Sequence, residues 1–140
     1  MPDYNLVAAT ERLLQQFITH LHEGASSFRY YKTRPLNIIN NHLTTLMLVD
    51  TNNYPVAYGH LEKENEVLWL GIAVADDYKG LGLGKQMMHA LIKAARYQNE
   101  AAITLSVDND NLVAQQLYHQ FGFEKIERSD MVTILKLQLA

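Results

Sequence analysis

The chain of 140 residues has no cysteine, only three prolines and no long uninterrupted apolar run. Without cysteine there are no disulfide bonds, no thiolate metal ligands and no thiol nucleophile. No window of about 18 consecutive apolar residues is present, so no membrane-spanning helix and no membrane partner are expected. Residues 1–4 are not a basic segment followed by an apolar run, as a secretion signal would be. These absences together predict a cytoplasmic protein.

The chain also lacks a basic excess, with 12 Lys and Arg against 15 Asp and Glu and a net charge of −3. A nucleic-acid-binding surface needs clustered positive charge, so no nucleic-acid partner is expected. Apolar residues make up 48% and charged residues 19% of the chain, as in ordinary globular proteins. No repeat and no Pro/Gly/Ser-rich linker interrupts the sequence. Residues 1–140 are therefore predicted to form one domain.

The spacing of apolar residues predicts the secondary structure. Strands are expected near residues 4–8 and over 43–49, 54–62, 66–74, 101–107, 123–128 and 131–139. Helices are expected from the N-cap Thr10 to a stop at Gly24, near 36–39, over 86–97 and over 111–121. Strands flanked by helices in this order predict an α+β (α/β layered) fold.

The last predicted strand is long and apolar for a strand at the end of a chain. Residues 132–139 hold five apolar residues (Val, Ile and Leu) and three polar ones. An exposed edge of this kind is usually paired or covered. Two arrangements follow: the strand pairs with a second copy, which would make a homodimer, or it pairs inside its own sheet.

Three glycines, Gly80, Gly82 and Gly84, lie between a predicted strand and a predicted helix. Glycine accepts backbone angles that other residues resist and allows close approach of a ligand. The free N–H groups of a helix's first turn favour an anion. The pattern therefore indicates a site for phosphate or pyrophosphate, with a tight turn that binds nothing as the alternative. Its spacing matches neither the P-loop nor the dinucleotide-binding fingerprint.

The predicted helix over 111–121 carries two stripes of side chains. Val113, Leu117 and Phe121 recur at four-residue spacing and are expected to be its buried stripe. Ala114 and Tyr118 lie on a different stripe. Taken alone, Tyr118 is either a half-buried core tyrosine or a functional residue.

Together these two segments resemble the GNAT superfamily of acyl-coenzyme A-dependent N-acyltransferases. The motifs that carry the resemblance are Lys79-x-x-Gly82-x-Gly84 and Asn111-x-x-Ala114-x-x-x-Tyr118-x-x-x-Gly122-Phe123. The resemblance covers roughly residues 69–126. It implies a mixed, mostly antiparallel central sheet flanked by helices. It also implies direct transfer of the acetyl group of acetyl-CoA to a primary amine through a ternary complex.

The resemblance implies roles for individual residues. Lys79 stands where the family has Gln or Arg, and Asn111 matches an asparagine that contacts the pantetheine arm. The residues expected to bind acetyl-CoA are Ile72, Ala73, Val74, Lys79, Gly80, Leu81, Gly82, Leu83, Gly84, Lys85 and Asn111. Tyr118 matches the tyrosine that acts as general acid toward the departing thiolate.

The attacking amine must lose a proton, so a base is needed. The glutamate that several family members carry in the third strand is replaced here by Leu68. The candidate bases are Glu66, His60 and Glu62, and an ordinary solvated strand-end residue is the alternative for each. Gly71 is expected either to ease a bulge in its strand or to pack beneath Trp69.

Residues 28–34 are aromatic and basic, which suits a planar or phosphorylated acceptor. The alternative is a segment that covers a helix, with its basic side chains reaching solvent. The expected acceptor is a small-molecule amine, with an amino sugar or a sugar nucleotide favoured. A peptide or protein N-terminus, a polyamine and an aminoglycoside remain open. No metal is expected. The residues expected to bind the acceptor are Phe28, Arg29, Tyr30, Arg34, Glu62 and Trp69.

Two other functions compete with an enzyme. A module that binds acyl-CoA without turning it over is favoured only by the missing strand glutamate. A phosphate-binding scaffold unrelated to acyl transfer would use the same segment around Gly80, Gly82 and Gly84, which we call the glycine loop.

Overall fold

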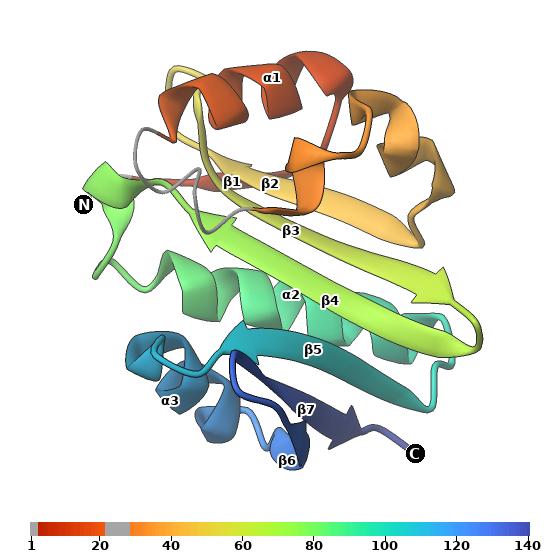
Figure 1. The fold of residues 1–140 in the computed structure, drawn as a ribbon. Helices are drawn as coiled ribbons and strands as arrows, with labels where there is room; N and C mark the ends of the chain where they lie inside the picture. Colours follow the sequence, from red (N-terminus) through yellow and green to blue (C-terminus); the bar gives the residue numbers. More distant parts are fainter. Residues whose placement is uncertain (1–2, 22–28) are drawn as a thin grey trace.

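A computed structural model describes residues 3–21 and 29–140 of the protein (Figure 1). The strands are β1 (Asn5–Ala8), β2 (Thr44–Val49), β3 (Pro55–Glu64), β4 (Val67–Val74), β5 (Ala102–Asp108), β6 (Glu124–Arg128) and β7 (Val132–Gln138). The α-helices are α1 (Glu11–His20), α2 (Leu83–Tyr97) and α3 (Leu112–Gln120). Short 3-10 helices are η2 (Arg29–Lys32), η3 (Leu36–Asn41) and η4 (Asp76–Tyr78).

The strands form one seven-stranded sheet in the order β1-β2-β3-β4-β5-β7-β6. Neighbouring strands are antiparallel except β4 and β5, which are parallel because the crossover helix α2 joins them. The predicted fold class, a mixed and mostly antiparallel sheet flanked by helices, is confirmed.

Alternating side chains give the sheet two apolar faces. On one face, Ala57 and Leu61 of β3 pack in a core with Met87 and Leu91 of α2, and α3 adds Tyr118. On the other face, Met47 and Tyr58 pack with Leu14 and Phe17 of α1. We call this second side, which α1 and η3 cover, the α1 face. Figure 1 shows the sheet between these two layers.

The parallel pair is held together at one end only. Trp69 of β4 lies opposite Thr104 of β5, and no other register pair joins these two strands. Beyond it the two strands diverge toward their C-terminal ends (Figure 1). Residues 72–74 and 106–108 therefore face a gap in the sheet instead of each other.

The closing strand β7 pairs with β5 on one side and with β6 on the other. This confirms the predicted pairing inside the sheet. The edge is formed by β6, whose five residues are all exposed and include four charged ones. Charged residues on an edge strand oppose further strand pairing. The premise for a homodimer therefore does not hold, and the homodimer itself stays a prediction.

Two predicted boundaries are wrong for backbone reasons. β4 begins at Val67 and not at Glu66, because Asn65 and Glu66 have φ of 50° and 70° and form a turn. α2 begins at Leu83 and not at Gln86, because Gly82 is its N-cap with φ 80°. Thr10 is confirmed as the N-cap of α1, where its side chain accepts a hydrogen bond from the Leu13 N–H. The predicted stop at Gly24 lies outside the described residues.

Candidate active site

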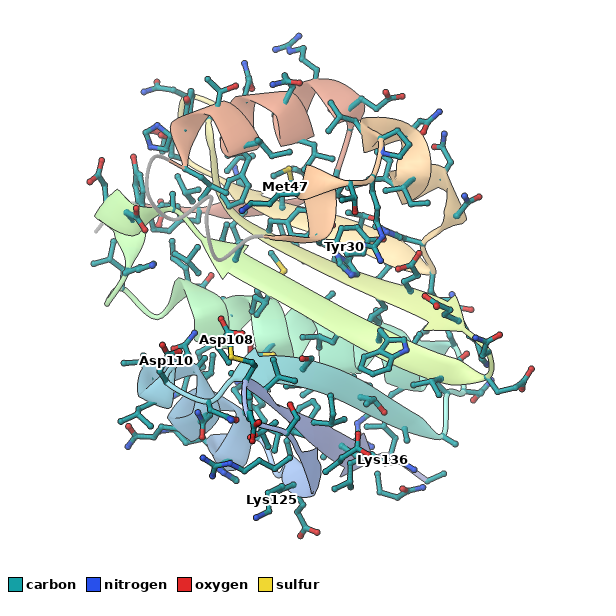
Figure 2. The ribbon with its side chains drawn as sticks, in the orientation of Figure 1. Tyr30, Met47, Asp108, Asp110, Lys125 and Lys136 are labelled. Carbon is teal, nitrogen blue, oxygen red and sulfur yellow. The ribbon has the colours of Figure 1, made fainter. Side chains whose placement is uncertain are left out.

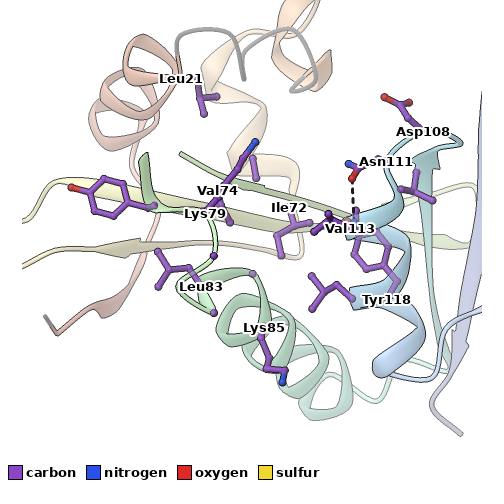
Figure 3. Close-up of a pocket in the computed structure, with 18 of the residues that line it drawn as sticks. Leu21, Ile72, Val74, Lys79, Leu83, Lys85, Asp108, Asn111, Val113 and Tyr118 are labelled. Carbon is purple, nitrogen blue, oxygen red and sulfur yellow. Dashed lines mark hydrogen bonds between the residues drawn. The ribbon is translucent and has the colours of Figure 1, made fainter. Parts of the chain in front are cut away.

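A cavity of about 740 Å³ occupies the gap between β4 and β5 (Figure 3). Its walls come from the end of α1, the C-terminal halves of both strands, the glycine loop, the start of α2 and the first turns of α3. Every residue expected to bind acetyl-CoA lines this cavity except Leu81, whose side chain is 54% exposed. Residues of both faces line the cavity: Ala73 packs with the α1-face core, and Ile72 and Tyr118 pack with the other core.

The glycine loop is shaped by backbone conformation more than by crowding. Gly80 and Gly82 have φ of 82° and 80°, and a Cβ added at either would meet nothing within 4 Å. Gly84 is different, because a Cβ there would lie 3.3 Å from Leu117 Cδ2 of α3. The backbone N–H groups of Leu83, Gly84 and Lys85 belong to the first turn of α2 and have no intrahelical acceptor. Because all three residues line the cavity, this turn is suited to an anion.

Lys79 adds a positive charge beside this turn. Its Nζ lies 3.0 Å from Asp76 Oδ1, and its side chain is 60% exposed. The ion pair holds the lysine at the mouth of the cavity and leaves part of the ammonium group open to a second anion.

Asn111 is the N-cap of α3, and its Oδ1 accepts a hydrogen bond of 3.1 Å from the Ala114 N–H (Figure 3). The cap uses the carbonyl oxygen of the side chain. Its NH2 group can therefore donate to a ligand in the cavity that Asn111 lines.

The predicted buried stripe of α3 is confirmed in part: Leu117 and Phe121 are half-buried against the core, but Val113 is not buried. Tyr118 is 6% exposed, whereas Val113 is 82% exposed. The first turn of α3 lies beside the cavity and not on the core, because β4 and β5 have already parted there. Tyr118 lies one turn further on, where the helix meets Phe123 and the central sheet.

The Tyr118 hydroxyl has no hydrogen-bond partner among the described residues. Burial raises the pKa of Tyr118 to about 12, because the apolar surroundings disfavour the phenolate. Near neutral pH the hydroxyl therefore keeps its proton, and the residue lines the cavity. A protonated hydroxyl without a partner is suited to donate to a ligand.

On the α1 face, His60 is almost fully buried beside the cavity wall. It is 3% exposed, its Nδ1 lies 2.7 Å from the Tyr58 hydroxyl, and it stands opposite Gly71 in the β3–β4 ladder. A Cβ at Gly71 would clash with the His60 ring. Gly71 therefore makes room for His60. The continuous register excludes the predicted bulge, and the predicted packing beneath Trp69 is replaced by packing beneath His60.

Burial lowers the pKa of His60 to about 3, and the nearby His42 and Arg34 add to this effect. The imidazole is therefore neutral across the physiological range. Because so low a pKa makes a weak base, this observation argues against the predicted role of His60 as the general base.

A hydrogen-bonded chain lies next to His60 on the α1 face. The Tyr30 hydroxyl donates to Glu62 Oε1 at 2.8 Å and lies 2.7 Å from His42 Nε2. His42 Nδ1 in turn lies 2.7 Å from Thr45 Oγ1. Arg34 covers the chain, with its guanidinium carbon 4.1 Å from the Tyr30 ring centre. Figure 2 shows Tyr30 over the central strands.

The remaining predicted residues are placed as follows. Trp69 is half-buried and stands opposite Glu62. Glu66 lies in the β3–β4 turn and lines a separate cavity of about 400 Å³ with Lys63 and Lys136. The structure therefore does not bring Glu66 together with Tyr118. Phe28 lies outside the described residues, and of Arg29 the structure describes the backbone in η2 alone.

Sequence reasoning missed His42, Thr45 and Ser106. The alternation of Tyr58, His60 and Glu62 along β3 is the signal that puts those three side chains on one face. His42 and Thr45 come from the segment before β2, and no local spacing relates them to His60. In the part of the chain that the structure describes, no helix is long and apolar enough to cross a membrane.

The parallel strands of a mixed sheet part around a cavity here. A helix capped by glycine begins on one side of this cavity, and a buried tyrosine lies on the other. This arrangement is that of GNAT-type acetyltransferases. The sequence matches the Acetyltransferase (GNAT) family over residues 8–123. The chain therefore belongs to this family of acetyltransferase enzymes.

Two relatives in Bacillus subtilis (strain 168) illustrate the match. The "Uncharacterized N-acetyltransferase YycN" is 31% identical over 107 residues, which cover 74% of this chain and 67% of that protein. The spermine/spermidine N(1)-acetyltransferase is 38% identical over 65 residues, which cover 45% of this chain and 43% of that protein. The chain thus matches less than half the length of the second relative.

Solved structures share the fold over almost the whole chain. A GNAT-family acetyltransferase from Staphylococcus aureus Mu50 has a TM-score of 0.81 at 20% identity and covers 99% of this chain and 100% of its own. PaiA N-acetyltransferase from Thermoplasma acidophilum, in complex with coenzyme A, has a TM-score of 0.82 at 16% identity and covers 98% of this chain and 99% of its own. At these identities the likeness shows the fold alone.

Proposed function

We propose that the protein transfers the acetyl group of acetyl-CoA to a primary amine of a small molecule, directly and through a ternary complex. One observation carries the proposal. The cavity between β4 and β5 has the free first-turn amides of α2 in one wall and the unpartnered hydroxyl of Tyr118 in another. A cytoplasmic location belongs to the same proposal and rests on the sequence.

The cavity walls suit the parts of acetyl-CoA. The first-turn amides of residues 83–85 would bind its pyrophosphate. On the side facing β5, residues 72–74 lack a ladder partner, so their backbone groups would pair with the amides of the pantetheine arm. The NH2 group of Asn111 would donate to the same arm.

Tyr118 would donate a hydrogen bond to the sulfur as the carbon–sulfur bond breaks. A free thiol has a pKa of about 8.5, far below that of Tyr118, so handing over the proton outright would cost about 5 kcal/mol. We therefore assign Tyr118 the stabilisation of developing negative charge on the sulfur, with full proton transfer left to the later release of the thiol.

The acceptor class rests on the α1 face. The sequence favours an amino sugar or a sugar nucleotide because of Arg34 and the aromatic residues before it. Arg34 also has a structural role, since its guanidinium donates to the Tyr30 carbonyl at 3.0 Å and covers the Tyr30 ring. A polyamine is supported by the net charge of −3 and by the name of the spermine/spermidine-acetylating relative.

Two measurements test the proposed function. Coenzyme A binding is followed by calorimetry, with ADP and inorganic pyrophosphate as competitors. Release of free thiol from acetyl-CoA is followed with a panel of amino sugars, sugar nucleotides, polyamines and peptides. We expect coenzyme A to bind more tightly than ADP, and at least one amine to be acetylated. Binding without any product would instead support the acyl-CoA sensor, and equal affinity for ADP would support the phosphate-binding scaffold.

A further inference from the structure

We infer that Glu62 binds a second positive group of the acceptor, so that the substrates of this enzyme are diamines: one ammonium group pairs with Glu62 while the other nitrogen attacks the thioester. This inference rests on the proposed function. It names the class of acceptor that the α1 face is built to hold.

Glu62 is a half-buried carboxylate without a cation. It accepts a hydrogen bond from the Tyr30 hydroxyl, and among the side chains that the structure describes it forms no ion pair. Trp69 stands directly opposite it on β4. A carboxylate withdrawn from water in aromatic surroundings is stabilised by a positive partner, and aromatic faces also attract cations.

The hydrogen bonds around Glu62 have a defined direction. The single proton of the Tyr30 hydroxyl is given to Glu62, so the contact with His42 requires a proton on His42 Nε2. In a neutral His42 the Nδ1 is then unprotonated and accepts from Thr45 Oγ1. Burial lowers the pKa of His42, which favours this neutral form. Each donor in this hydrogen-bonded chain of Thr45, His42 and Tyr30 thus points toward Glu62.

The other groups that face Glu62 do not neutralise it. His42 and His60 are neutral imidazoles, and Tyr30 keeps its proton because burial and Glu62 raise its pKa. Arg34 is the one cation nearby among the described side chains, and it lies over the Tyr30 ring and donates to the Tyr30 carbonyl. None of these described groups therefore forms an ion pair with Glu62.

The position of Glu62 relative to the cavity sets the length of the ligand. The cavity reaches the α1 face at Ala73, and its inner end, where β4 and β5 part, is at Ile72. Glu62 lies opposite Trp69, three residues before Ile72 on β4, which is about 10 Å in an extended strand. With the pantetheine arm paired to residues 72–74 as proposed, the thioester would lie at this inner end, too far for one amino group to contact both it and Glu62. Two amino groups joined by a short alkyl chain could reach both.

A metal ion is the competing ligand for this cluster. One ligand atom from each of His42, His60 and Glu62 lies within 4.8 Å of the others. However, the proton on His42 Nε2 leaves no lone pair facing the cluster, and the His42 and His60 rings are stacked at 26° instead of converging on one point. The geometry therefore favours an organic cation.

The test compares three acceptors of equal length: 1,5-diaminopentane, 1-aminopentane and 5-aminopentanoate. Each is assayed with acetyl-CoA on the wild type, on Glu62→Gln and on the matched control Glu64→Gln, whose residue lies exposed at the end of the same strand. We expect kcat/KM for the diamine to exceed that for the monoamine by about tenfold or more, since a charged hydrogen bond to a half-buried carboxylate is lost with the second nitrogen. The aminopentanoate should be the poorest acceptor.

Glu62→Gln should remove the preference for the diamine, mainly through KM, while Glu64→Gln keeps it. Calorimetry of coenzyme A on each variant shows whether its coenzyme site is intact. If coenzyme A binds normally but the diamine is not preferred, or Glu62→Gln keeps the preference, the inference is wrong and the proposed function stands. Stoichiometric binding of Zn²⁺ that Glu62→Gln abolishes would overturn the inference in favour of a metal site. Failure of coenzyme A to bind the wild type would overturn the proposed function itself.

Discussion

Tyr118 shows how burial prepares one residue for a role at neutral pH. Its pKa of about 12 keeps the hydroxyl protonated, and it has no hydrogen-bond partner among the described residues. Such a hydroxyl can stabilise a developing thiolate without first breaking a bond inside the protein. Loss of this hydroxyl should therefore lower turnover and leave the binding of coenzyme A unchanged.

Replacement of Tyr118 by Phe is expected to leave coenzyme A affinity within about twofold and to lower kcat by about 100-fold or more near neutral pH. The ring and its packing against Phe123 remain, and the hydroxyl alone is lost. Calorimetry and a thiol-release assay measure the two effects. Tyr97→Phe is the matched control, because Tyr97 is 84% exposed on α2. Unchanged turnover in Tyr118→Phe would remove this residue from the chemistry.

His60 couples the stability of the fold to pH. Its pKa is about 3 in the folded protein against 6.5 as its ordinary value, so the unfolded chain takes up the proton first on acidification. The stability that this histidine contributes is present above about pH 6.5 and is lost as the pH falls toward 3. The flanking groups His42, Glu62, Arg34 and Tyr30 contribute to the same network.

His60→Asn is expected to reduce the loss of unfolding free energy between pH 7 and pH 5 by about 2 kcal/mol relative to the wild type. Denaturant titrations at the two pH values measure it. His119→Gln is the control, since His119 is exposed on α3. An identical pH dependence in wild type and His60→Asn would mean that His60 is not buried in its neutral form.

At the scale of elements, the start of α2 depends on the left-handed conformation of Gly82. An alanine there is strained by about 1 to 2 kcal/mol, although a Cβ would meet no atom within 4 Å. The chain should relieve the strain by turning the first-turn amides away from the cavity. Gly82→Ala is therefore expected to weaken coenzyme A binding about tenfold or more in calorimetry.

Gly122 provides the control for this prediction. It has φ of 94° at the end of α3 and does not line the cavity. Gly122→Ala should lower the melting temperature as Gly82→Ala does, yet bind coenzyme A like the wild type. Equal loss of affinity in both variants would mean that general destabilisation, and not the loop, explains the effect.

Elements with a clear apolar period are predictable from this sequence, and those fixed by contacts between elements are not. Met87, Met88 and Leu91 form the buried face of α2 as their spacing indicates. The orientation of α3 is different, because it depends on where β4 and β5 part, and this divergence leaves no trace in the local spacing of Val113 and Tyr118.

For the whole molecule, the glycine loop and the tyrosine motif lead to the fold and to one wall of the candidate site. The residues of the opposite wall, on the α1 face, cannot be predicted from the sequence in the same way. His42 approaches His60 only after β2 and β3 have paired, and Glu66 leaves the strand because of its backbone angle. Tertiary pairing and backbone conformation therefore decide which titratable residues share the α1 face.

The central claim is that main-chain amides at the start of α2 and along the end of β4 bind coenzyme A. Titration of 15N-labelled protein with coenzyme A, followed by 1H–15N NMR, tests it most directly. We expect the amides of Ile72, Val74, Leu83, Gly84 and Lys85 to shift and saturate together, while Asn99 at the separate polar cavity stays unchanged. Saturable binding that leaves the amides of residues 83–85 unmoved would contradict the account.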